Sequence, residues 1–237
     1  MVHINAKNLI VDFPIYGPAS RSLKNAVLHS ATGGSLAKDA ANRVVVRALN
    51  DLSFEIREGD RIGLLGHNGS GKSTLLRVLA GGYEPVSGTL DMEGSVASML
   101  SITLGMESEA TGYENIVMIC TLMGLGSGEI ARLMPEIAEF TELGEYLSMP
   151  LRTYSSGMHM RIPFAVATAV KADIVLMDEW LSVGDESFSK KAQARLGEML
   201  DSAKILVLAS HSRALLEKNC NRIFHLEHGS LIQVDTL

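Results

Sequence analysis

Cysteine and long apolar segments are scarce in this sequence. Its 237 residues include only two cysteines, Cys120 and Cys220, which lie far apart and form no CxxC pattern. We therefore expect neither a disulfide framework nor a cysteine-based zinc site, and a reducing cytoplasm fits this composition. The longest apolar runs, such as IPFAVATAV at residues 162–170, are far too short to span a membrane, and the first residues lack the apolar core of a signal peptide. A role at a membrane is expected to require a partner protein.

Positive charge is also in deficit. The chain has 21 Lys and Arg against 27 Asp and Glu, which gives a formal net charge of −6. Proteins that bind nucleic acid need an excess of basic side chains to neutralise phosphates, so we expect no nucleic-acid partner. Hydrophobic residues make up 46% of the chain, which predicts a globular protein with one large domain or two small lobes.

The order of hydrophobic patterns predicts an α/β fold. Residues 2–11 and 44–56 are strand-like, and RIGLLG at 61–66 is typical of a short buried strand. Helical patterns occupy about 112–140, and from residue 156 helices alternate with strands such as DIVLM and KILVLAS. This alternation predicts a mostly parallel sheet covered by helices, with a helical lobe inserted before it. Residues 17–43 are expected to form a basic insertion, either a loop or a loop with a helix.

The segment LLGHNGSGKST at residues 64–74 follows a predicted buried strand and opens a helix. It matches the phosphate-binding pattern G-x-x-x-x-G-K-[ST] in the context that this pattern requires. The glycines allow backbone N–H groups to converge on phosphates, the lysine neutralises their charge, and the first hydroxyl binds Mg²⁺. The predicted ATP-binding residues of this loop are Gly66, His67, Asn68, Gly69, Ser70, Gly71, Lys72, Ser73 and Thr74, with His67 and Asn68 expected to make simple backbone contacts.

Acidic residues and a histidine follow two further apolar strands. IVLMDE at residues 174–179 ends in Asp178 and Glu179, and KILVLAS is followed by His211. Open parallel sheets bind ligands at the carboxyl ends of their strands, so we expect these side chains at the phosphate site. Asp178 is predicted to hold Mg²⁺ through water, and Glu179 to polarise the attacking water. His211 is predicted to contact the γ-phosphate or that water.

The turn Ser155, Ser156 and Gly157 stands at the start of a predicted helix. Its backbone N–H groups lie where the helix dipole is positive, which suits an anion such as phosphate. An ordinary helix cap is the alternative, because serine is also a preferred N-cap residue.

Together these motifs resemble the ATP-binding subunits of ATP-binding-cassette (ABC) transporters over nearly the whole chain. The resemblance is carried by YSSGM at residues 154–158, about twenty positions before Asp178, and then by DEWLSVGD and His211. It implies one nucleotide-binding domain over residues 1–237, with a P-loop core, an antiparallel β lobe at about 1–60 and a helical lobe at about 105–170. Its implied cofactors are ATP and Mg²⁺.

The resemblance also implies a head-to-tail dimer. In that family the turn at Ser155, Ser156 and Gly157 contacts the ATP held by a second copy, and Asp185 belongs to the dimer-contact loop. An aromatic ring stacks on adenine, for which Tyr16 is the candidate, although core packing is the alternative. The chain departs from the family pattern at two places. Ser156 replaces a glycine, and the glutamine that the family usually has between the phosphate-binding loop and the YSSGM segment is missing near residue 101.

The form YSSGMxxR, which includes Arg161, and the SVGD segment are similar to exporters of O-antigen, capsular polysaccharide and teichoic acid. This implies an ATPase at the cytoplasmic face of the inner membrane that drives a lipid-linked glycan through a separate permease. Another cargo, or a soluble ABC ATPase without transport, remains the alternative. For the basic insertion, the hypothesis is a helix in which Arg21 and Lys24 meet the headgroup of the arriving glycan, and a solvated loop is the alternative.

Overall fold

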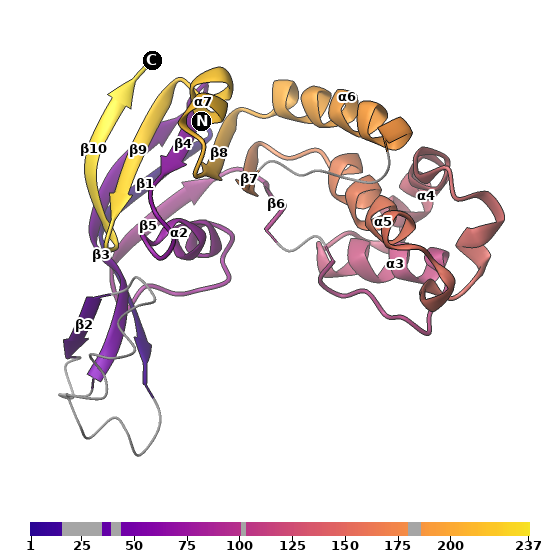
Figure 1. The fold of residues 1–237 in the computed structure, drawn as a ribbon, viewed down its shortest axis with the longest axis horizontal. Coiled ribbons are helices and arrows are strands. Elements are labelled where there is room, and N and C mark those ends of the chain that lie inside the picture. Colours follow the sequence, from indigo (N-terminus) through magenta and orange to yellow (C-terminus); the bar gives the residue numbers. More distant parts are fainter. Residues whose placement is uncertain (16–34, 39–43, 101–102, 180–185) are drawn as a thin grey trace. The chain divides into compact units, whose positions relative to one another are not determined.

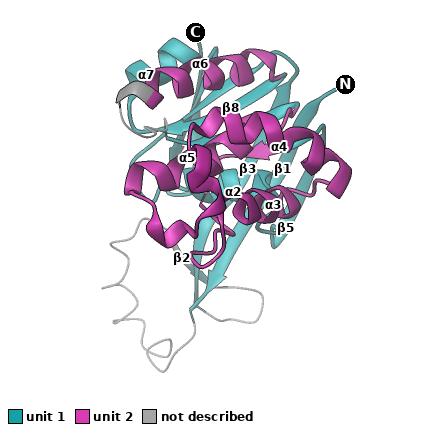
Figure 2. Ribbon diagram, turned by 90° about the vertical axis from the view of Figure 1, so that its right-hand side faces the viewer, with its two compact units in different colours: residues 1–96, 173–180, 204–237 teal, residues 97–172, 181–203 magenta. Residues whose placement is uncertain are grey.

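The computed structural model describes residues 1–15, 35–38, 44–100, 103–179 and 186–237 (Figure 1). The chain divides into two compact units, shown in Figure 2. The first, called the sheet unit here, comprises residues 1–96, 173–180 and 204–237. The second, the helical unit, comprises residues 97–172 and 181–203.

A four-stranded antiparallel sheet forms one part of the sheet unit. Its strands are β1 (His3–Pro14), β2 (Ser35–Lys38), β3 (Val44–Arg57) and β5 (Ser87–Glu93), in the order β2-β3-β1-β5. Along β3 the buried positions alternate from Leu52 to Ile56, as expected for a strand with one face on a core.

Strand β2 corrects the prediction of a loop, or a loop with a helix, for all of residues 17–43. It pairs antiparallel with β3, from Ser35 opposite Arg47 to Lys38 opposite Val44. The physical reason lies in β3, which begins with three valines whose branched side chains favour extended backbone. Residues 16–34 and 39–43, with Tyr16 and the predicted helix around Arg21 and Lys24, lie outside the described residues.

The second sheet confirms the predicted parallel core. Its order is β10-β9-β4-β8-β7-β6, in which β4 pairs parallel with β8 and β9, and β7 pairs parallel with β8. Every residue of β8 is buried, as expected for a central strand covered on both faces. The strands are β4 (Arg61–Leu65), β6 (Val96–Ser98), β7 (Ile174–Asp178), β8 (Ile205–Ser210), β9 (Arg222–Glu227) and β10 (Ser230–Thr236).

Two helices of the sheet unit pack on this parallel core. Helix α2 (Lys72–Leu79) contacts β7 and β8, and α7 (Arg213–Asn219) contacts β4 and β8. The approach of α7 is close, since a Cβ added at Gly63 would lie 3.1 Å from the Leu216 side chain. A glycine in β4 therefore permits the helix to lie directly on the strand.

The register of the parallel strands aligns their carboxyl ends. Leu65 at the end of β4 lies opposite Ser210, and Asp178 at the end of β7 lies opposite Ala209. The segments that follow β4, β7 and β8 consequently begin at the same edge of the sheet, although the sequence separates them widely.

The helical unit contains α3 (Gly112–Leu122), α4 (Ser127–Thr141), α5 (Ser156–Ala169) and α6 (Glu186–Ser202), with short 3₁₀ turns at Gly144–Ser148 and Leu151–Thr153. Its core includes three phenylalanines, Phe140, Phe164 and Phe188, whose ring centroids lie 5.5 to 6.4 Å apart. Arg161, the last residue of the YSSGMxxR pattern, lies 4.7 Å over the Phe188 ring and donates to the Thr141 carbonyl oxygen. This arginine therefore anchors α5 inside the unit.

Both cysteines are free and buried. Burial raises the pKa of the Cys220 thiol to about 12. The thiol is therefore protonated at neutral pH and is a poor nucleophile.

Asp173 joins the start of β7 to two neighbouring segments. Its carboxylate pairs with Lys204 Nζ at 2.9 Å and accepts from Ser95 N–H at 3.1 Å and from Ser95 Oγ at 3.0 Å. The Lys204 contact, followed by the two Ser95 hydrogen bonds, lowers the pKa of Asp173 from 3.8 to about 2. A carboxyl with a lowered pKa stabilises the fold above its ordinary pKa, and this stabilisation is lost as pH falls through the folded value.

We expect Asp173→Asn to lower the urea midpoint at pH 7, and the difference from wild type to shrink as pH falls from about 4 to about 2. The measurement is urea unfolding followed by circular dichroism at a series of pH values. Glu145→Gln, a change at an exposed carboxylate in the helical unit, is the control. A difference between wild type and Asp173→Asn that stays constant over this pH range would contradict the assignment.

Candidate functional site

The loop between β4 and α2 has a backbone that only glycine accommodates. Gly69 and Gly71 have φ values of 79° and 107°, in the left-handed region. A Cβ on Gly71 would lie 2.9 Å from the carbonyl oxygen of Ala48, and one on Gly66 would collide with Ser70 Oγ. The glycines therefore permit the tight loop that connects β4 to α2.

The polar groups of this loop fit a bound phosphate. Helix α2 begins at Lys72 without a side-chain cap and without an acidic residue in its first turn. Its positive end is thus open to an anion. Ser70 Oγ is fully buried and has no hydrogen-bond partner among the described residues. Buried hydroxyls normally have a partner, so this unpaired hydroxyl is an exception within the loop.

Lys72 folds back over the loop. Its Nζ donates to the carbonyl oxygens of Gly66 at 2.6 Å and His67 at 3.0 Å. Burial lowers the pKa of Lys72, while the carboxylates of Asp178 and Glu179 raise it. The ammonium group is therefore held at the loop by two neutral acceptors, which phosphate oxygens can replace as stronger, charged acceptors.

Ser73 and Asp178 bring two oxygen ligands together. Ser73 Oγ donates to Asp178 Oδ2 at 2.5 Å, which joins the first turn of α2 to the end of β7. A hydroxyl and a carboxylate beside a phosphate loop are the oxygen ligands that Mg²⁺ prefers. The residues thus fit the predicted magnesium site.

Glu179 and His211 form a second pair at the same edge. His211 Nδ1 lies 2.8 Å from Glu179 Oε1, and both side chains are largely exposed, at 75% and 63%. Glu179 has a left-handed backbone with φ 66°, and its N–H donates to the carbonyl oxygen of Ala209 at 2.8 Å. A non-glycine residue in this region is uncommon, and here the hydrogen bond to β8 holds the backbone in place.

The structure therefore brings together the sequence-predicted residues of the sheet unit. The loop residues 66–74 follow β4, Asp178 and Glu179 lie at the end of β7, and His211 follows β8. Together they offer an anion cradle, oxygen ligands for a cation and a carboxylate to activate water.

The turn at residues 155–157 lies in the helical unit, at the start of α5. Ser155 Oγ accepts from Met158 N–H at 3.4 Å, so the serine acts as an N-cap within its own helix. A Cβ added at Gly157 would meet no atom of the described residues within 4 Å. Packing around it therefore does not require glycine at this position. Asp185 lies outside the described residues.

The turn between β9 and β10 supports the phosphate loop, and the sequence analysis did not identify it. Gly229 N–H donates to the Ser70 carbonyl oxygen at 3.0 Å. With φ 80°, Gly229 approaches Ala48 so closely that an added Cβ would lie 2.6 Å from that carbonyl oxygen. The glycine marks a hairpin turn in the sequence, but no local pattern indicates its contact with a loop that lies far earlier in the chain.

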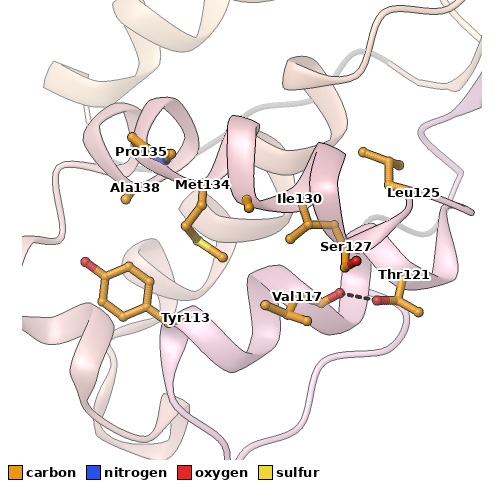
Figure 3. Close-up of a pocket in the computed structure, with 10 residues that line it drawn as sticks. Tyr113, Val117, Thr121, Leu125, Ser127, Ile130, Met134, Pro135 and Ala138 are labelled. Carbon is orange, nitrogen blue, oxygen red and sulfur yellow. Dashed lines mark hydrogen bonds between the residues drawn. The ribbon is translucent and has the colours of Figure 1, made fainter.

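The helical unit carries an apolar groove between α3 and α4, with a volume of about 800 Å³ (Figure 3). Tyr113 and Val117 from α3 face Ile130 and Met134 from α4. Val117 is 42% exposed and Tyr113 40% exposed, which is high for large apolar side chains. The full lining is Tyr113, Val117, Thr121, Leu125, Ser127, Ile130, Ala131, Met134, Pro135 and Ala138.

Comparison with known proteins gives consistent matches. The family model of ABC transporters matches residues 49–182. The chain is 46% identical to the O-antigen export system ATP-binding protein RfbE of Yersinia enterocolitica, over 98% of both chains. It is 36% identical to the teichoic acids export ATP-binding protein TagH of Staphylococcus haemolyticus, over 97% of this chain and 83% of the relative.

A solved structure has the same fold. The dimeric ATP-binding cassette MJ0796 bound to ADP and Pi superposes with a TM-score of 0.68, over 99% of this chain and 98% of that chain. The sequence identity is 18%, so this match establishes the fold alone. It confirms the predicted cassette architecture.

We expect Lys72→Ala to weaken ATP binding by at least about tenfold, because a charge-assisted hydrogen bond contributes roughly 1.5 to 3 kcal/mol. Isothermal titration calorimetry with ATP measures the change. Lys171→Ala, at an exposed lysine of the helical unit, is the matched control and should bind as wild type does. Wild-type affinity in Lys72→Ala would refute the phosphate-loop assignment.

Proposed function

The chain belongs to the ABC transporter family and is an ATPase of that family, and on this premise we propose that it powers export of a lipid-linked polysaccharide. The observation that carries the proposal is the 46% identity to an O-antigen export ATP-binding protein along 98% of both chains. The similarity to a teichoic acid export protein also supports the proposal, because YSSGMxxR and SVGD resemble segments of polysaccharide and teichoic acid exporters. The two units are proposed to form one nucleotide-binding domain at the cytoplasmic face of the inner membrane.

When bound, ATP supplies the γ-phosphoryl group, and Mg²⁺ screens the charge that develops on it. Lys72 exchanges its two carbonyl acceptors for phosphate oxygens, and Ser73 with Asp178 holds the cation. Glu179 orients a water molecule and accepts its proton as the oxygen attacks phosphorus. His211, which already contacts Glu179 Oε1 at 2.8 Å, positions that carboxylate and the phosphoryl group.

The turn at Ser155, Ser156 and Gly157 is proposed to complete the site of a second copy. Two features of the turn support this. The first turn of α5 contains no acidic residue, so its positive end suits an anion. Gly157 has open space around it, which leaves room for a phosphate or a neighbouring backbone. Tyr16 and Asp185 are proposed, on the family resemblance alone, to contact adenine and the second copy.

Transport requires a pathway through the membrane. Among the helices that the structure describes, none combines the length and apolarity needed to cross a bilayer. From the similarity to export ATP-binding proteins we infer that a separate permease supplies the pathway, and that the groove between α3 and α4 receives an apolar cytoplasmic segment of it. The apolar, exposed side chains of Tyr113 and Val117 support this choice of occupant.

Glu179→Gln is expected to bind ATP with near wild-type affinity but to slow hydrolysis by about 10²-fold or more, because glutamine cannot accept the proton of the attacking water. Phosphate release by the purified protein measures the rate. In a strain that lacks this gene, wild type should restore surface polysaccharide and Glu179→Gln should not. Normal hydrolysis by the variant would exclude Glu179 as the catalytic base, and restored export would contradict ATP-driven transport.

Val117→Glu is expected to reduce polysaccharide export several-fold while the ATPase activity of the isolated subunit stays at the wild-type level. The charge would have to be desolvated when an apolar segment enters the groove. Surface polysaccharide and copurification with the permease are the measurements. Val86→Glu places the same charge at a valine that is 61% exposed in the sheet unit, and it should export normally. Equal export by both variants would exclude the groove as the docking surface.

A further inference from the structure

Two histidines and a glutamate meet beside the phosphate loop, outside the residues that the proposed ATP chemistry uses through their side chains. His67 belongs to the loop, whereas Glu227 and His228 stand where β9 turns into β10. Their possible ligand atoms all lie within 4.8 Å of one another, and the two imidazole rings are 5.3 Å apart. All three side chains are exposed, so solvent ions reach them directly.

The hydrogen bonding of His67 leaves it suited to bind a metal. Its Nδ1 lies 2.8 Å from the carbonyl oxygen of Asn68. A carbonyl oxygen only accepts, so Nδ1 carries the proton and Nε2 keeps a lone pair for a metal. Metal-binding histidines commonly have their second nitrogen fixed in this way, because it sets the tautomer and the ring orientation.

The backbone brings the other two ligands to a fixed place. His228 has φ 47°, and the next residue, Gly229, donates its N–H to the Ser70 carbonyl oxygen at 3.0 Å. The turn is therefore attached to the loop that carries His67.

We propose that His67, Glu227 and His228 form a binding site for a transition-metal ion of the Zn²⁺ class. Two imidazole nitrogens and one carboxylate oxygen are a ligand set typical of Zn²⁺, with bonds of about 2.0 to 2.2 Å. Ligand atoms around such an ion are separated by roughly 3.4 Å in tetrahedral geometry, so exposed side chains within 4.8 Å of one another need only a small adjustment. Water completes the coordination.

The position of the site gives the ion a regulatory effect. A bound ion links the phosphate loop to the β9–β10 turn through His67. The carbonyl oxygen of this residue accepts from Lys72 Nζ at 3.0 Å, and Lys72 must leave that acceptor to bind phosphate. The ion therefore stabilises the loop arrangement that competes with nucleotide, and it inhibits the ATPase.

The first test measures metal binding without nucleotide. Protein without a histidine tag is treated with EDTA, dialysed into phosphate-free buffer and titrated with Zn²⁺ in a calorimeter. His228→Asn removes the imidazole but keeps a residue that tolerates the left-handed backbone, so it should fold. We expect one Zn²⁺ per wild-type chain and at least about tenfold weaker binding by His228→Asn.

Five histidines outside the site make a matched control necessary. His3→Asn removes a histidine whose Nε2 contacts Asp91 instead, and it should bind Zn²⁺ as wild type does. Unchanged affinity in His228→Asn, or an equal loss in His3→Asn, overturns the site. Because this readout involves neither ATP nor export, failure of the proposed export function would leave it unaffected.

The second test measures the regulatory effect. ATPase activity is followed at an ATP concentration near KM and at excess Mg²⁺ while Zn²⁺ is added, because inhibition that competes with nucleotide is lost at saturating ATP. His228→Asn should show wild-type activity without Zn²⁺, and it should require at least about tenfold more Zn²⁺ for half inhibition. Equal inhibition of the two proteins overturns the proposed coupling between the metal site and the phosphate loop.

Discussion

The parallel pairing of β4 with β8, and of β8 with β7, is the constraint on which the site depends. It places Leu65 opposite Ser210 and Asp178 opposite Ala209, so three distant segments leave the sheet at one edge. A shift of one residue in this register would turn every side chain of a strand to the opposite face. The apolar residues of β7 and β8 are buried, so such a shift would expose them and lower the free energy of unfolding. The core therefore fixes the register that places Asp178 and Glu179 at this edge.

A second constraint comes from the antiparallel sheet. The carbonyl oxygen of Ala48 in β3 lies so close to Gly71 and Gly229 that a Cβ at either position would approach within 3 Å of it. The phosphate loop, strand β3 and the β9–β10 turn therefore pack against one another through their backbones. Their close packing limits the movement of the loop backbone, so its N–H groups are held in place before a phosphate arrives.

The sequence predicted those parts of the structure that local patterns determine. GHNGSGKST identified the loop, and the apolar runs that end at Asp178 and Ser210 identified two central strands, because a buried strand and a phosphate loop each have a compact signature. Strand β2 was missed because its four residues are a strand only through pairing with β3. The sequence also placed Glu179 and His211 at one edge of the sheet, but their direct contact and the support of the loop by Gly229 depend on tertiary placement, which no single-sequence pattern encodes.

The polar groups of the site are largely paired with one another, and this pairing has a consequence for binding. Lys72 is held by two carbonyl oxygens, Ser73 by Asp178, and Glu179 by His211. A ligand that enters must replace these partners, so the hydrogen bonds contribute to its binding free energy only the difference between the new bonds and the old ones. Neutral ligands gain little in such an exchange. A triphosphate gains more, because its charged oxygens are stronger acceptors than carbonyl oxygens. The internal pairing therefore favours anions of high charge over other solutes that reach the same edge of the sheet.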